Sequence, residues 1–400
     1  MTRPADLIRI RNTEASWIAL ILAIPSYLIV LIGTSAVLQG CFYLLYLVGL
    51  GFVWQRQQQL HLSPKFVLTT LIFFSAWIIP NLYVAHSGRL ESEMLSLPVL
   101  FYHVTILFLV VLWFRSWTMS ASRPRQLVHD LARPLVILLS PLVVLILIES
   151  LRLKLQFPDQ RPDPFNYRHL NGEVILMFVL AAVAMPGRWI KIGAVILAVG
   201  CLTLIENRGG LLSVAIVVSC LLALSIMRRL TWKYILLAAL GIATLLFIFQ
   251  EPLYELVDFF FLLEHQSRGL GTGFTHRLPV WVEAWHEIQR VPWTGVGFWV
   301  SPFPFIPFGE HVNHARAVHN AFLRLWVENG TVLFAVTLSI LLLTAVQIER
   351  KALSWQRMAF YSILAYYFFI PRHLTLNPLS MLLYLVILQA LCLPMINNKK

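Results

Sequence analysis

Charged residues are scarce in this chain of 400 residues and make up only 12% of it. Soluble domains carry about twice that share, roughly 25%. Hydrophobic residues reach 58%, which is more apolar surface than a water-soluble core of this size can bury. A lipid bilayer accommodates it, provided that apolar runs of about 20 residues form helices that satisfy their own backbone groups. The composition therefore excludes a soluble fold and predicts an all-α polytopic membrane protein.

Several motifs of soluble enzymes are also missing. There is no GxSxG elbow and no GxxxxGK[ST] phosphate loop, so a serine hydrolase and nucleotide-driven transport lack support. His286-Glu287 lacks the second histidine of HExxH, and the histidines at His311, His314 and His319 beside Glu310 match no standard zinc spacing. The basic residues lie in small groups between apolar runs, with no continuous patch that could track a phosphate backbone. No metal site, cofactor or nucleic-acid partner is predicted.

The cysteines offer neither a disulfide framework nor a redox motif. Cys41, Cys201, Cys220 and Cys392 all lie inside apolar runs, and none has CxxC spacing, so we expect small core residues. A cleavable signal peptide is not expected, because the first apolar run begins near Trp17, lacks a small-residue cleavage site and leads at once into a second run.

What the chain does have is a series of long apolar runs, which predicts about twelve transmembrane helices. They lie near residues 16–34, 36–54, 66–85, 97–114, 133–149, 172–186, 189–205, 210–227, 233–250, 326–347, 358–371 and 378–394. Pro186-Gly187 and the run from Glu206 to Gly210 predict tight turns between neighbouring helices.

The distribution of charge predicts the orientation. An even number of spans puts both termini on one side, and the basic residues of the short loops concentrate on that side, which is therefore cytoplasmic. We expect an inner-membrane protein with helices one to nine in 1–250, a periplasmic loop at 251–325 and helices ten to twelve in 326–400. Shorter outer stretches lie at 150–171 and 206–210.

The loop at 251–325 is long enough to be functional or a small domain in itself. Thr275 can cap a helix in which Pro279 occupies the first turn. An apolar stripe then repeats at helical spacing, at Val280, Trp281, Ala284, Trp285 and Ile288. Such a stripe fits a helix on the membrane surface and equally a helix packed on the transmembrane bundle.

Arg208 stands at the outer end of a membrane helix, where an arginine is a poor topological signal. Gly209 and Gly210 follow it and allow a close approach of backbone and ligand. A guanidinium there can hold a phosphate through two parallel hydrogen bonds. The alternative is an interfacial arginine paired with Glu206.

Arg277 opens the amphipathic helix of the long loop. A cation at a helix N-terminus opposes the macrodipole unless an anion joins it, and helix N-termini bind phosphates. The alternative is a solvated loop arginine.

His319 precedes Asn320, which can cap the tenth membrane helix. The helix dipole disfavours the imidazolium, so the ring stays neutral and able to accept a proton from a hydroxyl. The alternative is a polar loop histidine.

At these residues the chain resembles the superfamily of O-antigen ligases and polymerases, which are bacterial envelope glycosyltransferases. Three features match in order: the Arg208-Gly209-Gly210 turn, the run Arg277 to Trp281 followed by Arg290 to Gly297, and His319-Asn320 followed after nine residues by Gly330. The last position of the ligase motif, which holds Gly, Thr or Tyr, is Leu333 here. The resemblance therefore concerns the superfamily as a whole.

The resemblance implies a GT-C-like membrane glycosyltransferase that needs neither metal nor nucleotide, with short helices in a large periplasmic loop between helices nine and ten. The donor would be O-antigen on undecaprenyl diphosphate, and the acceptor a sugar hydroxyl of the lipid A-core. Arg208 and Arg277 would stabilise the diphosphate, and His319 would be the general base. Further candidates for substrate binding are Arg316, Arg324, Asn320, Gly209 and Gly210.

Three alternatives stay open. An O-antigen polymerase uses the same donor with a growing lipid-linked glycan as acceptor, and a protein O-oligosaccharyltransferase belongs to the same superfamily. A transporter for a lipid-linked sugar would need strongly polar residues in mid-membrane, and the helix centres of this chain are mainly apolar.

Overall fold

The computed structural model describes nine helices, with residues 19, 20 and 23 in addition. The described ranges are 64–86, 124–158, 162, 164, 168–226, 273–297, 320–350, 354–369 and 378–392. Within them the regular structure is helical, and no strand occurs, so the predicted all-α class is confirmed for this part of the chain. The helices are α3 (Pro64–His86), α5 (Pro124–Gln156), α6 (Arg168–Ala184), α7 (Arg188–Leu204), α8 (Arg208–Ile226), α11 (Gly273–Arg290), α12 (Ala321–Arg350), α13 (Ser354–Phe368) and α14 (Pro378–Cys392).

Eight of these helices correspond to predicted membrane segments. Two described helices, Asp130–Gln156 and Ala321–Arg350, are long and apolar enough to cross a membrane, and shorter apolar helices accompany them. The predicted segments near 36–54, 97–114 and 233–250, and nearly all of 16–34, lie outside the described residues. The total of twelve spans therefore stays a prediction.

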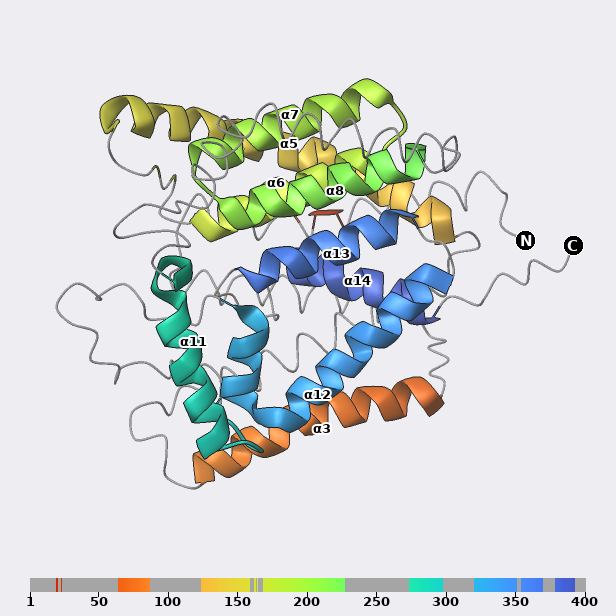
Figure 1. Ribbon diagram of the computed structural model, residues 1–400. Coiled ribbons are helices and arrows are strands. Elements are labelled where there is room, and N and C mark those ends of the chain that lie inside the picture. The colour runs from red at the N-terminus through yellow and green to blue at the C-terminus, as the bar shows by residue number, and fades with distance from the viewer. Residues whose placement is uncertain are drawn as a thin grey trace, which may run out of the picture.

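The centre of the bundle is α6, which is hydrophobic on all sides because neighbours surround it. Every residue from 171 to 184 is buried. Helices α5, α7, α8, α13 and α14 pack around it (Figure 1). The outer helices expose large apolar side chains instead, such as Ile196 on α7 and Leu343 on α12. Exposed apolar surface on this scale suits a lipid environment.

One end of the bundle collects the described parts of the segments predicted to lie outside the membrane. At this end the N-terminal turn of α6 meets the C-terminal end of α13, because Gly172 packs against Tyr366. At the opposite end of the two helices, Trp355 donates to the carbonyl oxygen of Leu180 at 2.9 Å. Helices α6 and α13 are therefore antiparallel, and the α7–α8 turn, α11 and the start of α12 lie at the Gly172 end (Figure 1). We call it the α11 end.

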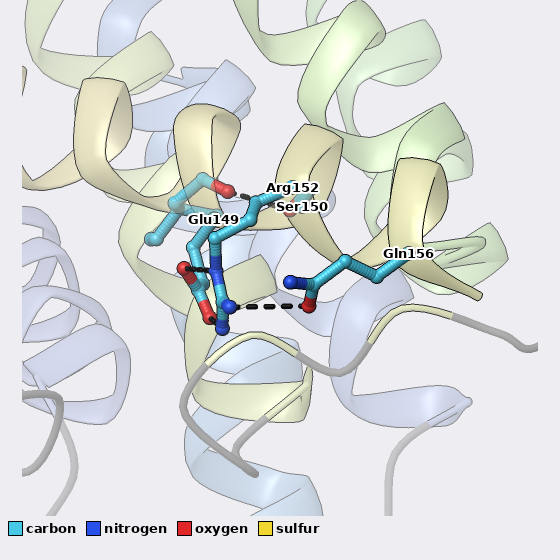
Figure 2. A network of polar contacts seen from close by, with 5 residues as sticks. Glu149, Ser150, Arg152 and Gln156 are labelled. Carbon is cyan, nitrogen blue, oxygen red and sulfur yellow. Dashed lines mark hydrogen bonds and ion pairs between the residues drawn. The ribbon is translucent and has the colours of Figure 1, made fainter.

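Helix α5 is longer than the apolar run that predicted it. Its 33 residues span about 50 Å, against about 30 Å of hydrocarbon in a bilayer. The end nearer to Gln156 carries a polar network, in which Arg152 donates from Nε to Glu149 at 2.7 Å and from Nη1 to Gln156 at 3.1 Å (Figure 2). Arg152 is 53% exposed. The predicted membrane segment 133–149 lies within α5, and at the Gln156 end these side chains allow the helix to continue into a polar environment.

The turn between α7 and α8 is tighter than predicted. It consists of residues 205–207, and Glu206 has a positive φ of 51°. Asn207 Oδ1 accepts the N–H of Gly210 at 2.9 Å and so acts as the N-cap of α8. The prediction that Gly209 and Gly210 belong to the turn was wrong, because this cap starts the helix at Arg208. The predicted turn at Pro186-Gly187 is confirmed, with Gly187 at a φ of 116°.

Helix α11 lies across the direction of α8 and α13 at the α11 end (Figure 1). It begins at Gly273, two residues before the predicted cap at Thr275, and that prediction was wrong. Pro279 stands in the second turn. Proline lacks the N–H that would donate to the carbonyl of residue 275, so the helix loses one hydrogen bond there. The helix still extends on the N-terminal side of Pro279, back to Gly273.

Candidate functional site

The first turn of α12 is held by Asn320. Its Oδ1 accepts the N–H groups of Phe322 and Leu323, both at 3.0 Å, and its carbonyl accepts the N–H of Arg324 at 3.0 Å. Otherwise unpaired donors of the first turn are thereby satisfied. The predicted capping role of Asn320 is confirmed. His319 precedes it in the chain but lies outside the described residues, as does Arg316.

Helix α12 breaks at Gly330, and nine residues separate this glycine from the cap residue Asn320. The backbone there has φ 76° and ψ 175°, a region open essentially only to glycine. The break separates a short helix, residues 321–329, from the longer one at 331–350. The short helix starts ahead of the predicted segment at 326 because Asn320 supplies its cap. We call residues 321–329 the short helix.

The segment 291–297, which follows α11, fills the break. Its backbone forms hydrogen bonds with the N–H and carbonyl groups that have no partner within the interrupted helix. These are Val296 N–H to Val327 O at 2.9 Å, Gly297 N–H to Glu328 O at 2.9 Å, Thr331 N–H to Pro292 O at 2.7 Å, and the Thr331 hydroxyl to Pro292 O at 2.7 Å. Segment 291–297 and the broken helix therefore form one unit, although about 35 residues separate them in the chain.

Two glycines make this contact close enough. A Cβ on Gly295 would lie 2.6 Å from the carbonyl oxygen of Glu328, and a Cβ on Gly330 would lie 2.1 Å from the carbonyl oxygen of Trp293. Both glycines also have positive φ, 69° and 76°. Any larger residue at either position would push two backbones apart.

Helix α11 itself packs on the short helix through its apolar stripe. Val280, Ala284 and Ile288 are buried in one cluster with Val327. The rings of Trp285 and Trp326 meet edge to face with centroids 5.6 Å apart. Of the two arrangements that the stripe left open, the structure shows packing on the bundle. Arg277 lies in the first half of α11, and its side chain lies outside the described part of the chain.

An ion pair lies inside the short helix, one turn apart. Arg324 donates from Nε to Glu328 Oε1 at 2.8 Å, with side-chain exposures of 17% and 0%. Asn329 beside it accepts a hydrogen bond from Asn81 of α3 at 3.0 Å. The short helix is thus fixed against α3 on one side and against the segment 291–297 on the other.

Arg208 is half-buried and is the first residue of α8. Its neighbour Asn207 packs on Gly172 together with Tyr366, since a Cβ on Gly172 would lie 2.2 Å from Asn207 Nδ2 and 2.3 Å from Tyr366 Oη. Two residues beyond Tyr366, the ring of Phe368 meets the ring of Trp281 of α11 at 6.2 Å. Arg208 therefore stands at the same end of the bundle as α11 and the start of α12.

Of the two glycines after Arg208, Gly210 has a packing role that the sequence did not indicate. Gly210 is buried, and a Cβ there would lie 2.6 Å from Leu202 of α7. The backbone carbonyl of Gly209 accepts the hydroxyl of Ser213 at 2.8 Å. At Gly210 the absence of a side chain serves the contact between α7 and α8.

Sequence reasoning missed Glu328 and Gly295. The sequence signal for Glu328 was an acid followed two residues later by glycine, in a helix that is otherwise mostly apolar. No pattern near Glu328 in the sequence indicates that this part of the helix pairs with the segment 291–297. Within the described ranges, no group of three or more His, Cys, Asp or Glu residues stands close enough to hold a metal ion.

Residues 193–338 match the family model described as O-Antigen ligase. This range, less than half of the chain, is therefore similar to the domain shared by O-antigen ligases and polymerases. The matched range includes the start of α8, the whole of α11 and the break in α12, and it covers every site residue predicted from the sequence. No curated protein matches the chain. The resemblance seen in the motifs is confirmed over this range, and at a coarse level the match supports an enzyme of the bacterial membrane.

Proposed function

We propose that the protein is the O-antigen ligase of lipopolysaccharide synthesis. It transfers O-antigen from undecaprenyl diphosphate to a sugar hydroxyl of the lipid A-core, at the periplasmic face of the inner membrane. The observation that carries the proposal is the ligase-family match over 193–338. The gathering of Arg208, α11 and the capped start of α12 at one end of the bundle supports it.

The proposed reaction is a direct displacement. The acceptor hydroxyl oxygen bonds to the anomeric carbon of the donor sugar, the bond from that carbon to the phosphate oxygen breaks, and undecaprenyl diphosphate leaves with the electron pair. Displacement from the opposite face inverts the anomeric centre. The hydroxyl proton goes to His319, which directly precedes the cap of α12 in the chain.

Negative charge grows on the leaving diphosphate during this step. Fixed guanidinium groups stabilise such charge more in the transition state than in the bound substrate, which lowers the barrier. We assign this role to Arg208 at the start of α8 and to Arg277 in α11. Arg208 is the first residue of α8, where free backbone N–H groups also favour an anion. Arg277 is the fifth residue of α11 and does not open that helix as expected, so its contribution is that of its guanidinium alone.

The decisive experiment is transfer in vitro by the purified protein, from undecaprenyl-linked O-antigen to purified lipid A-core in detergent, with no ion gradient. Transfer under these conditions excludes a transporter. His319→Ala should insert and purify as the wild type does and should lose transfer, because no group then removes the hydroxyl proton. Wild-type transfer by this variant would contradict the assignment of the base.

A deletion strain separates ligase from polymerase. Loss of a ligase leaves bare core lipopolysaccharide, whereas loss of a polymerase leaves core that carries one repeat unit. Bare core, restored to a full ladder by the wild-type chain, is the expected result. A single-repeat band would replace the ligase with the polymerase of the same superfamily.

A further inference from the structure

The ion pair in the short helix has geometry that suits substrate binding, a role that rests on the proposed function. Asn320, Arg324 and Glu328 follow one another at four-residue intervals, so they share one face of the helix. At one end of this stripe Asn320 caps the helix directly after the predicted base. At the other end Glu328 is completely buried.

Stability alone does not explain this pair. Burying a carboxylate costs several kcal/mol in desolvation even after relaxation, and apolar residues of similar volume are often at least as stabilising as a buried ion pair. The more exposed pair Glu149–Arg152 on α5 carries a smaller cost of this kind. The short helix therefore retains a costly arrangement where a Leu or Met pair would pack.

The position of Arg324 is also unfavourable by itself. It lies in the first turns of a helix, where a cation opposes the macrodipole. A carboxylate one turn later offsets that repulsion and accepts Nε at 2.8 Å. A guanidinium has five N–H donors in a planar fork, so fixing one of them orients the others. The side chain keeps 17% exposure at the α11 end of the bundle.

We propose that Glu328 is a positioning residue for the transfer reaction. It fixes the guanidinium of Arg324 at the start of α12, where that guanidinium binds a phosphate of a lipid-linked substrate. Two substrates of the proposed reaction carry phosphate: the diphosphate donor and the lipid A part of the acceptor. In either case an oriented guanidinium would bind a phosphate or diphosphate group through charge-assisted hydrogen bonds.

The test is a double-mutant cycle of Glu328→Gln, Arg324→Gln and the double variant. Transfer is measured while the donor and the acceptor are varied in turn. A charge-assisted hydrogen bond is worth about 1.5–3 kcal/mol, so Glu328→Gln should raise the KM for one of the two lipids roughly tenfold to a hundredfold. The lipid whose KM rises identifies the phosphate, and kcat should change much less.

The cycle separates positioning from folding. If Glu328 acts through Arg324, its replacement adds nothing once Arg324 is glutamine. An equal cost in both backgrounds, or an unchanged KM for both lipids, overturns the proposal. Arg324→Lys keeps the charge but cannot present Nε, so it should raise the same KM; a wild-type KM there also counts against the proposal.

The control variant is Glu149→Gln, which removes the carboxylate of an exposed Arg–Glu pair on α5 and should leave transfer unchanged. A wild-type protein that transfers no glycan would refute the proposed function. The positioning role of Glu328 is then tested by measuring the binding of each lipid directly. Glu328→Gln should weaken the binding of undecaprenyl diphosphate or of purified lipid A-core. Unchanged affinity for both lipids overturns the positioning role.

Discussion

Replacing Gly330 by alanine tests whether the break in α12 is the structural basis of the site. The change adds one methyl group at a residue with φ 76° and ψ 175°. The new Cβ would lie 2.1 Å from the carbonyl oxygen of Trp293 and 2.8 Å from the backbone nitrogen of Thr294. These neighbours are backbone atoms, so no side-chain rotation relieves the clash.

The expected cost has two parts. A residue other than glycine in this backbone region costs about 1–3 kcal/mol. Forcing an extra methyl group into a packed site costs about 1–3 kcal/mol more. The displaced segment 291–297 also loses its hydrogen bonds to the short helix, including those to Val327 and Glu328. We therefore expect a loss of about 2–6 kcal/mol in the free energy of unfolding.

The assay is thermal unfolding in detergent together with transfer activity. Gly330→Ala should lower the melting temperature by several degrees and reduce transfer, because the short helix then loses its fixed place against α11. Gly200→Ala is the matched control. Gly200 is exposed in the middle of α7, nothing lies within 4 Å of its added Cβ, and alanine favours a helix over glycine by about 1 kcal/mol. A Gly330→Ala protein as stable and active as the Gly200→Ala protein would refute the reasoning.

Two further changes probe the helix starts at the α11 end. Asn320→Ala should lower the free energy of unfolding by about 0.5–2 kcal/mol, since two backbone N–H groups lose their acceptor. Asn320→Asp keeps that acceptor and should retain the stability of the wild type. Equal melting temperatures for the two variants would contradict the capping role. Arg208→Lys should weaken the binding of undecaprenyl diphosphate, because lysine cannot make two parallel hydrogen bonds to a phosphate; wild-type affinity in a binding titration would remove Arg208 from the diphosphate site.

The helical class was predictable because it depends on local physics. A backbone in hydrocarbon must pair its polar groups within its own segment, so apolar runs of sufficient length become helices whatever their neighbours are. The ends of the helices were less predictable. Helix α5 continues past its apolar run because Arg152, Glu149 and Gln156 form a polar network there, and α8 starts early because of the Asn207 cap.

The site was predictable where one residue acts on its immediate neighbours. Asn320 caps the helix that it precedes, and both partners of that contact lie within three residues. The orientation of α11 was not predictable, because an apolar stripe suits a membrane surface and a protein surface equally. Its buried residues Val280 and Ala284 face Val327, which lies far along the chain.

By itself, then, the amino-acid sequence determined that the chain is helical and apolar, where the tenth helix is capped, and which family its motifs resemble. Each of these depends on residues that are close together in the chain. Only the tertiary structure decided that Gly295 and Gly330 bring two backbones into contact and that the Arg324–Glu328 pair is buried. A contact between distant segments depends on how all the intervening helices pack, and the identity of the residues involved does not contain that information.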